Sequence, residues 1–517
     1  MPAINLTTFK GEMPVIEDKK LPMGHAVVAR NCDLSSGSLL ASKGFGAAVH
    51  TFSASAFDTL TRYPYGNGFM SFSSDVDMVR GPLANDEWER VYWTGDGQPR
   101  YSTSDQGGAS SLELGLPAPP NGLLLTSTTG TAIEGALEIS CTYICTFVTK
   151  YGEEGPPSSA SAVHTRYDGQ VLNFTGIPAH PSGGFDIDFI RYYRTEGGGV
   201  FNHVFDIPMG STGFNDDVKS VDLGISCPSL DWLAPDARMI GLTYLGNGIL
   251  AGFFGNTLCF SEPYYPHAWP VDYQLAFKDD IVGIGMGGSG LVVTTKQEPW
   301  IVFGSHPSSM SQQMTDTPYG CVSKLSMVDM GAYILYASND GLVAAAGGDS
   351  KLISGGIISG QDFKALNPST WKAFRFDDRY FVIHDTGCIS FSQAEGFKHF
   401  DIIGEAAYFD AEEGELYVLL ANRTVVKWGD GANLTAKWRS GILTLPQRVP
   451  LTCARIDQDG PCTLRLYYDG ELKVETIITG PDMFRLPAGV FREAQIELET
   501  SGTIHSVSLG QTARELI

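Results

Sequence analysis

The sequence predicts an all-β protein: a β-propeller that is interrupted by a second β module and followed by a C-terminal β-sandwich. A strand–turn–strand hairpin recurs through the second half of the chain at intervals of 36 to 47 residues. Repeats of this length without helical periodicity between them are typical of propeller blades. The composition agrees, because 60 glycines, 28 prolines and 11% aromatic residues among 517 are typical of turn-rich β proteins.

The predicted propeller blades occupy residues 235–432. The recurring hairpins are spaced by 42, 42, 47 and 36 residues, because they begin at Ile249, Leu291, Tyr333, Tyr380 and Leu416. Their turns contain Gly, Asn and Asp, which tolerate the positive φ angles of tight hairpins.

Residues 1–122 form an N-terminal β region that we expect to contribute to the propeller or its platform. Residues 46–52 and 89–98 have strand patterns, and the second contains the turn dipeptide Asp96-Gly97. A blade supplied from this side of the chain would help to close the ring. Residues 116–122 are rich in proline and predict a linker.

Residues 123–225 predict a separate module. An alternating strand over 143–151 leads into the sharp turn Gly-Glu-Glu-Gly-Pro-Pro-Ser at 152–158, and a second strand covers 188–195. This order resembles a fibronectin type III-like sandwich, and the resemblance implies a module that binds or spaces other proteins.

Residues 436–517 predict the C-terminal β-sandwich. Segments such as 462–470 and 493–499 alternate apolar and polar residues with a period of two. Strands of this kind bury one face and expose the other.

Charge and composition exclude several function classes. The net charge of −23 and pI near 4.7 argue against a protein that grips nucleic acid, which needs a basic face. They fit a soluble surface, and they also fit the wall of a conduit through which DNA slides. No apolar run is long enough to span a membrane, and the first residues lack the pattern of a secretory signal. Nine cysteines without a CxxC pair predict buried free thiols, as in a reducing cytoplasm.

No catalytic, cofactor-binding or metal-binding constellation emerges from the sequence. The glycine-rich stretch 283–290 contains GxGxxG, but a β run follows it where a dinucleotide site needs a helix. The ten histidines show no HxxxH spacing. Acidic pairs such as Asp75/Asp77 and Glu412/Glu413 are expected by chance in so acidic a chain, and we interpret them as solvated turns or edges. We therefore expect no enzyme and no cofactor.

Two segments are candidate interfaces. The loop 261–270 contains three prolines and three aromatic residues, Tyr264, Tyr265 and Trp269. These rings form a binding patch or, as the alternative, pack over the end of a blade. The segment Phe484-Arg485-Leu486 mixes apolar residues with arginine, which is typical of interface hot spots. Its alternative is that Phe484 and Leu486 are core residues.

Several motifs together resemble one family of viral structural proteins. They are the opening Leu21 to Asn31, the segment Trp88 to Arg100, the loop Phe260 to Trp269, the segments Cys321 to Met327 and Tyr336 to Leu342, and the ends Phe484 to Gly489 and Arg514 to Leu516. The series is similar to the tail nozzle, or tail tubular protein B-like, proteins of short-tailed bacteriophages.

This resemblance implies a virion tail protein that is synthesised in the host bacterial cytoplasm and is not an enzyme. Six copies would form a homo-oligomeric ring below the portal adaptor protein. The ring would close the channel for the genomic DNA until ejection, let the DNA pass without specific binding, and anchor tail fibres or spikes.

Two other function classes stay open. A propeller-type receptor- or carbohydrate-binding tail protein would stack sugars on Tyr264, Tyr265 and Trp269, although the blades do not repeat this aromatic cluster. A polysaccharide hydrolase would need carboxylates that converge in the central funnel.

Overall fold

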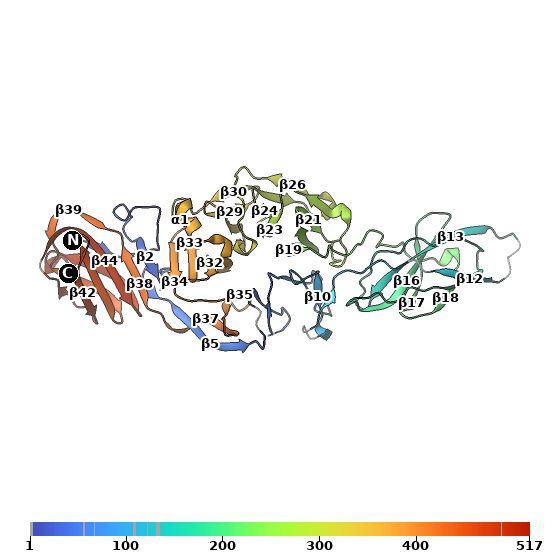
Figure 1. Ribbon diagram of the computed structural model, residues 1–517, viewed down its shortest axis with the longest axis horizontal. Coiled ribbons are helices and arrows are strands. Elements are labelled where there is room, and N and C mark those ends of the chain that lie inside the picture. The colour runs from blue at the N-terminus through green and yellow to red at the C-terminus, as the bar shows by residue number, and fades with distance from the viewer. Residues whose placement is uncertain are drawn as a thin grey trace.

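The computed structural model describes residues 4–54, 57–66, 68–106, 110–120, 123–130, 135–487 and 489–516. Figure 1 shows an elongated molecule with three parts in a row: a β-sandwich that holds both chain ends, a group of small sheets in the middle, and a separate β module at the far end. Strands predominate, and α1 (Gly360–Ala365) is the one α-helix in these ranges. The prediction of an all-β protein is confirmed.

Six sets of four antiparallel strands, which we call the middle sheets, form the central part. The first three are β8 (Asp77–Arg80), β9 (Val91–Thr94), β10 (Arg100–Ser102) and β11 (Leu112–Glu113); β19 (Ile240–Gly246), β20 (Ile249–Phe254), β21 (Thr257–Phe260) and β22 (Gln274–Ala276); and β23 (Ile281–Gly287), β24 (Gly290–Thr295), β25 (Pro299–Phe303) and β26 (Ser311–Met314). The others are β27 (Val328–Asp329), β28 (Ile334–Ala337), β29 (Leu342–Ala346) and β30 (Asp349–Leu352); β31 (Lys372–Phe376), β32 (Arg379–His384), β33 (Gly387–Ser392) and β34 (Gly396–Phe400); and β35 (Ala406–Asp410), β36 (Glu415–Leu419), β37 (Thr424–Asn433) and the N-terminal β5 (Lys43–Thr51).

The first strands of the middle sheets contact one another in chain order. β8 contacts β19, and the contacts continue from β19 through β23, β27 and β31 to β35. β35 then contacts β6 (Thr59–Arg62), which forms a hairpin with β7 (Phe69–Phe72). This hairpin leads back to the first sheet, where the ring centroids of Phe72 and Trp93 lie 6.5 Å apart. Closure of the sheets into a propeller stays a prediction.

The module at the far end, which we call the insert, consists of two sheets. One contains β12 (Leu124–Thr129), β15 (Val171–Thr175) and β18 (Gly213–Asp216); the other contains β14 (His164–Tyr167), β13 (Glu138–Thr149), β16 (Ile187–Glu196) and β17 (Asn202–Pro208). Apolar residues of both sheets share one core, in which the rings of Tyr192 and Phe214 lie 4.5 Å apart. The expected fibronectin type III-like order of the strands is not tested by this pairing.

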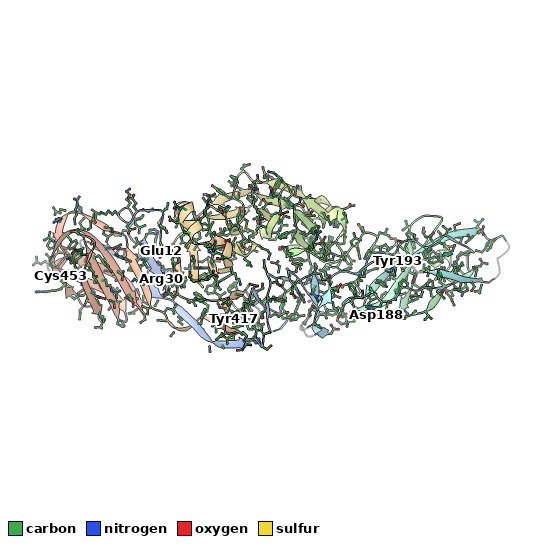
Figure 2. All side chains as sticks on the ribbon, viewed as in Figure 1. Glu12, Arg30, Asp188, Tyr193, Tyr417 and Cys453 are labelled. Carbon is green, nitrogen blue, oxygen red and sulfur yellow. The ribbon has the colours of Figure 1, made fainter. Side chains whose placement is uncertain are left out.

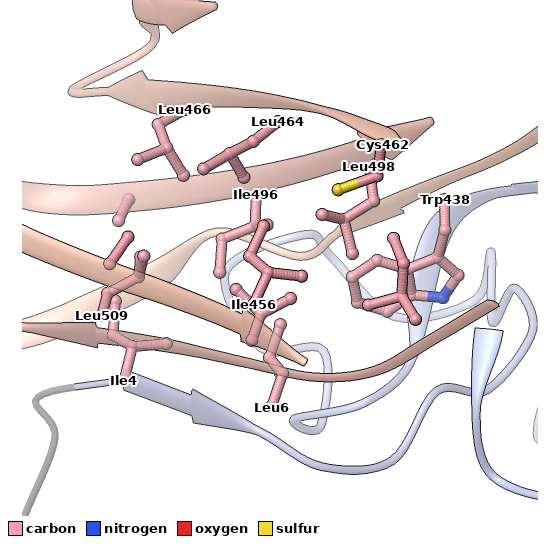
Figure 3. Close-up of a cluster of buried hydrophobic side chains, with 14 of the residues drawn as sticks. Ile4, Leu6, Trp438, Ile456, Cys462, Leu464, Leu466, Ile496, Leu498 and Leu509 are labelled. Atoms are coloured by element: carbon pink, nitrogen blue, oxygen red, sulfur yellow. The ribbon is translucent and has the colours of Figure 1, made fainter. Parts of the chain in front are cut away.

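The sandwich at the opposite end also has two sheets. One contains β3 (Cys32–Asp33), β4 (Leu39–Ala41), β45 (Thr503–Gly510), β40 (Cys453–Asp459) and β43 (Phe484–Arg485), with β1 (Ile4–Leu6) paired to β45. The other contains β2 (Ala26–Arg30), β38 (Ala436–Ser440), β44 (Val490–Thr500), β41 (Cys462–Tyr468) and β42 (Glu471–Ile478), with β39 (Leu443–Pro450) paired to β44. Figure 3 shows the apolar side chains that fill the space between the sheets, among them Leu6, Trp438, Ile456 and Leu498.

We expected residues 1–122 to contribute to the propeller or its platform, but the first of them belong to the sandwich. β1 and β4 pair with β45, and β2 pairs with β38, so residues 4–41 supply strands to both sheets of the sandwich. Only β5 and the strands after it join the middle sheets. The sandwich is therefore built from both ends of the chain, because the buried strands around Ile456 and Leu498 need the N-terminal residues to cover them.

One sheet runs without interruption from the middle sheets into the sandwich. β34 pairs with β2 in parallel, with Arg30 opposite His399, and β2 pairs with β38 on its other side. Glu12 and Arg30 lie at this junction (Figure 2), where Glu12 accepts the N–H of Ala29 at 2.7 Å and Arg30 forms an ion pair with Asp401 at 2.7 Å. The two parts are therefore joined by main-chain hydrogen bonds.

All nine cysteines are buried and free. In the described ranges, no helix is long and apolar enough to cross a membrane.

Candidate functional site

The aromatic loop 261–270 divides its rings between surface and core. Tyr264 and Tyr265 are 50% and 43% exposed, whereas Trp269 is only 3% exposed. Trp269 packs in a core with Tyr92 and Leu250, and its indole N–H donates to the carbonyl of Pro266 at 2.8 Å. The expectation that Trp269 belongs to a surface patch is therefore wrong, because its ring fills the core between the first two middle sheets.

Other residues join the two tyrosines at the surface. The ring of Tyr265 lies 4.5 Å from that of Trp232, on the segment that returns from the insert. Leu230 and Leu233, on either side of Trp232, are 55% and 42% exposed. Behind them His267 is fully buried, and burial lowers its pKa to about 3, so its ring is neutral and belongs to the packing.

The second candidate interface, Phe484-Arg485-Leu486, also divides its side chains between core and surface. Leu486 is buried in the sandwich core, and Phe484 is half-buried against it. Only Arg485 between them is exposed. β43 pairs with β40, with Arg485 opposite Cys453, and this alternation turns Phe484 and Leu486 inward.

A polar pocket of about 520 Å³ lies beside the first strands of the middle sheets. It is found where β6, β8 and β35 end, at Arg62, Arg80 and Asp410. The lining also contains three tyrosines and two glutamates: Tyr63, Tyr65, Tyr408, Glu412 and Glu413. Its volume lies in the range of about 300–1,000 Å³ that is typical of small-ligand sites.

The charges of this pocket are paired. Arg62 bridges Asp410 at 2.7 Å and Glu413 at 2.8 Å, and Arg80 binds Glu412 at 2.7 Å. Burial opposes the negative charge of Asp410, but hydrogen bonds from the Glu413 N–H and from Arg62 outweigh it, so the pKa of Asp410 is lowered. Burial and a hydrogen bond to Glu413 raise the pKa of Tyr417 to about 12; Figure 2 places Tyr417 in the middle sheets.

A second charged group links middle sheets that are far apart in the chain. The ammonium of Lys324 lies 2.7 Å from Asp75 and 2.8 Å from Asp77, and Asp77 also accepts the N–H of Gly241 at 3.0 Å. Burial opposes the charge of Lys324, but the carboxylates of Asp77 and Asp75 outweigh it and raise its pKa. For Asp77 burial is the larger effect, and its pKa is raised.

The insert is attached to the first middle sheet by a buried ion cluster. Arg90, which is 6% exposed, binds Asp86 at 2.8 Å and Glu153 at 3.0 Å. Glu153 belongs to the Gly-Glu-Glu-Gly turn of the insert. The adjacent Glu154 accepts the hydroxyl of Tyr193, within the insert, at 2.6 Å and that of Ser229, on the returning segment, at 3.2 Å; Figure 2 labels Tyr193 in the insert. The sequence predicts a sharp turn here, but no local pattern indicates that its two glutamates form buried contacts.

The glycine-rich stretch 283–290 has a structural role, and the described residues contain no metal-binding group. The glycine-rich stretch 283–290 forms β23, the turn and the start of β24. A Cβ at Gly283 would lie 2.4 Å from the sulfur of Met327, so this glycine allows close packing between sheets. No group of His, Cys, Asp or Glu side chains that could hold a metal ion occurs in the part of the chain that the structure describes.

Comparisons with known proteins find only remote likenesses. No protein-family profile and no curated protein matches the chain. Among solved structures, it is similar to PorZ, an essential bacterial surface component of the type-IX secretion system of Porphyromonas gingivalis (12% identity, 64% of this chain and 46% of that chain, TM-score 0.27). It is also similar to a Bacteroides thetaiotaomicron protein of unknown function (8% identity, 74% and 100%, TM-score 0.25) and to an exo-β-1,3-galactanase from Phanerochaete chrysosporium (9% identity, 91% and 99%, TM-score 0.17). TM-scores this low support no argument about function.

Proposed function

We propose that the middle sheets close into a β-propeller. Support comes from the unbroken order of contacts between first strands, from β8 to β35 and β6. Lys324 precedes the fourth sheet, yet it binds Asp75 and Asp77 at the first, which is expected when the first strands surround one axis. β5 completes the last sheet from the N-terminal side, as in propellers whose final blade joins strands from distant parts of the chain.

We propose further that the chain is a structural component of a bacteriophage virion tail, namely a subunit of the nozzle ring. The resemblance of its motifs to tail nozzle proteins is the starting point. In this proposal six copies surround the DNA ejection channel below the portal adaptor protein and anchor fibres or spikes. The chain is synthesised in the host bacterial cytoplasm and carries no enzyme activity.

The observation that carries this proposal is the attachment of both end parts to the middle sheets by ordered contacts. The sandwich shares a continuous sheet with the middle sheets through β34, β2 and β38. The insert is held by the buried pair Arg90–Glu153. An elongated subunit whose parts are joined in this way suits a ring that must stay closed until DNA is ejected.

Electron cryomicroscopy of the virion tests the proposal. We expect six copies of this chain around the tail axis, below the adaptor. A virion that lacks the chain, or that carries it away from the axis, contradicts the proposal. The same map tests whether the wall of the channel is acidic or neutral, as expected if DNA passes without binding; a continuous basic wall contradicts that part alone.

A second candidate function is saccharide binding in the pocket at Arg62 and Arg80. Its guanidinium, carboxylate and phenol groups offer both donors and acceptors, which suits the hydroxyl groups of a sugar. A glycan array tests this candidate. Tyr244 of β19 is a control, because it is 43% exposed and lies outside the pocket. Binding that Tyr65→Ala abolishes and Tyr244→Ala preserves would support the candidate, and a wild-type protein that binds no glycan contradicts it.

A further inference from the structure

The two exposed tyrosines belong to an apolar area with an acidic rim. Tyr264, Tyr265, Leu230 and Leu233 are joined by Val271, which is 58% exposed. Three carboxylates lie near these residues: burial, and after it Glu262, Asp231 and Asp272, raise the pKa of Tyr273 next to this area to about 12. We call this set of residues the acidic aromatic area.

Tyr264 adopts a backbone conformation that costs free energy. Its φ is +66°, in the left-handed region that bulky residues avoid. Gly248 permits it, because a Cβ at Gly248 would lie 2.6 Å from the Tyr264 ring. In the single chain this backbone conformation displays a half-exposed ring.

A basic counterpart lies on the sandwich. Val449 of β39 pairs with Phe491 of β44, and Arg448 and Arg492 flank this pair on the exposed side. Like charges on neighbouring strands destabilise a sheet. The pKa of Asp469 is lowered by the N–H groups of residues 493 and 492 and, less strongly, by the charge of Arg448, so this carboxylate balances part of the positive charge. The nearby carboxylate of Asp469 already accepts the N–H groups of residues 492 and 493, at 3.2 and 3.0 Å.

Apolar residues accompany these arginines. Pro450 and Val490 are direct partners in the ladder, Pro450 is exposed, and Val490 is 61% exposed. We call Arg448, Pro450, Val490 and Arg492 the basic area. Arginine over tyrosine gives cation–π contacts, and both residue types are enriched in interfaces.

We propose that the acidic aromatic area of one copy binds the basic area of the next copy. Each copy has a net charge of −23, so copies repel one another unless their interface joins areas of opposite sign. Because the two areas lie on different parts of the chain, the contact is head-to-tail. Such a contact builds a ring when its rotation closes and a filament when it does not, and the proposed ring assembly requires the first. The inference rests on the proposed ring assembly and names the surfaces that build it.

Charge reversal in the full-length chain tests the interface. One double variant carries Arg448→Glu and Arg492→Glu, and the other carries Asp231→Lys and Asp272→Lys. Sedimentation velocity over a concentration series at low ionic strength, where surface charges act most strongly, measures association. We expect each double variant alone to associate at least about tenfold more weakly than the wild type. An equimolar mixture of the two should regain association, because every contact between unlike copies then joins opposite charges.

A matched control separates an effect at the proposed interface from a general effect of the net charge. Lys351→Glu with Lys473→Glu changes the net charge as much as the arginine variant does, at two exposed sites outside both areas, and should associate like the wild type. Wild type that stays monomeric at every concentration, reversal without effect, or a mixture without rescue overturns the inference. A ring that forms in spite of both reversals leaves the nozzle proposal intact, whereas a virion without this chain in its tail contradicts that proposal separately.

Discussion

Replacing Arg90 by methionine should detach the insert from the middle sheets. Arg90 binds Asp86 through two nitrogens, at 2.8 and 3.1 Å, and Glu153 through a third, at 3.0 Å. The side chains of Asp86 and Glu153 are each only 4% exposed, so the variant leaves two buried carboxylates without a cation. Removing one partner of a buried ion pair costs about 3–5 kcal/mol, and we expect a loss of this size.

The loss is measured by urea denaturation followed by circular dichroism, with limited proteolysis to locate the part that unfolds first. Cleavage should appear between the insert and residue 240, at lower urea than in the wild type. Arg238→Met is the matched control, because Arg238 binds Asp236 at 2.8 Å with a side chain that is 74% exposed; solvent screens such pairs, so its transition should not move. Equal effects of the two substitutions would refute the argument from burial.

Three further predictions follow from the same contacts. Lys324→Met should lower the free energy of unfolding of the middle sheets by about 1–3 kcal/mol, because Asp75 and Asp77 lose their cation. Urea denaturation measures this loss. Trp269→Ala should cost about 3–5 kcal/mol, as in other aromatic core truncations, whereas Tyr264→Ala should leave thermal stability unchanged or raised. The lowered pKa of Asp410 adds stability above pH ~4 that is lost as pH falls through the folded value; the deficit of Asp410→Asn should therefore be present at pH 7 and vanish in acid.

The sequence revealed the strands that are buried on both faces. All five predicted hairpins exist as the two middle strands of a four-stranded sheet, for example β20 with β21 and β24 with β25. Every residue of β24 is buried, and such strands read as continuous apolar runs. The flanking strands were harder to predict because they are exposed: all four residues of β26 face solvent, so nothing in their composition distinguishes them from a loop.

Contacts between distant parts of the chain left no local signal. β1 has three residues and pairs with β45 at the other end of the chain, Ile4 opposite Leu509, and no periodicity can be recognised over so short a strand. The pairing of Lys324 with Asp75 spans 249 residues. For the candidate sites, composition identified the aromatic loop but could not separate Trp269 from the two tyrosines, because all three side chains are large and apolar and only the fold decides which one is covered.

The two junctions of this molecule differ in physical kind, and the difference bears on how it could assemble. The junction with the sandwich consists of main-chain hydrogen bonds in a continuous sheet, which salt does not screen. The junction with the insert depends on a buried ion pair inside an aromatic cluster, which resists screening because it is desolvated. The areas proposed to join neighbouring copies, in contrast, carry their charges at an open surface. Ionic strength is therefore expected to weaken the proposed association between copies while leaving both junctions within each copy intact.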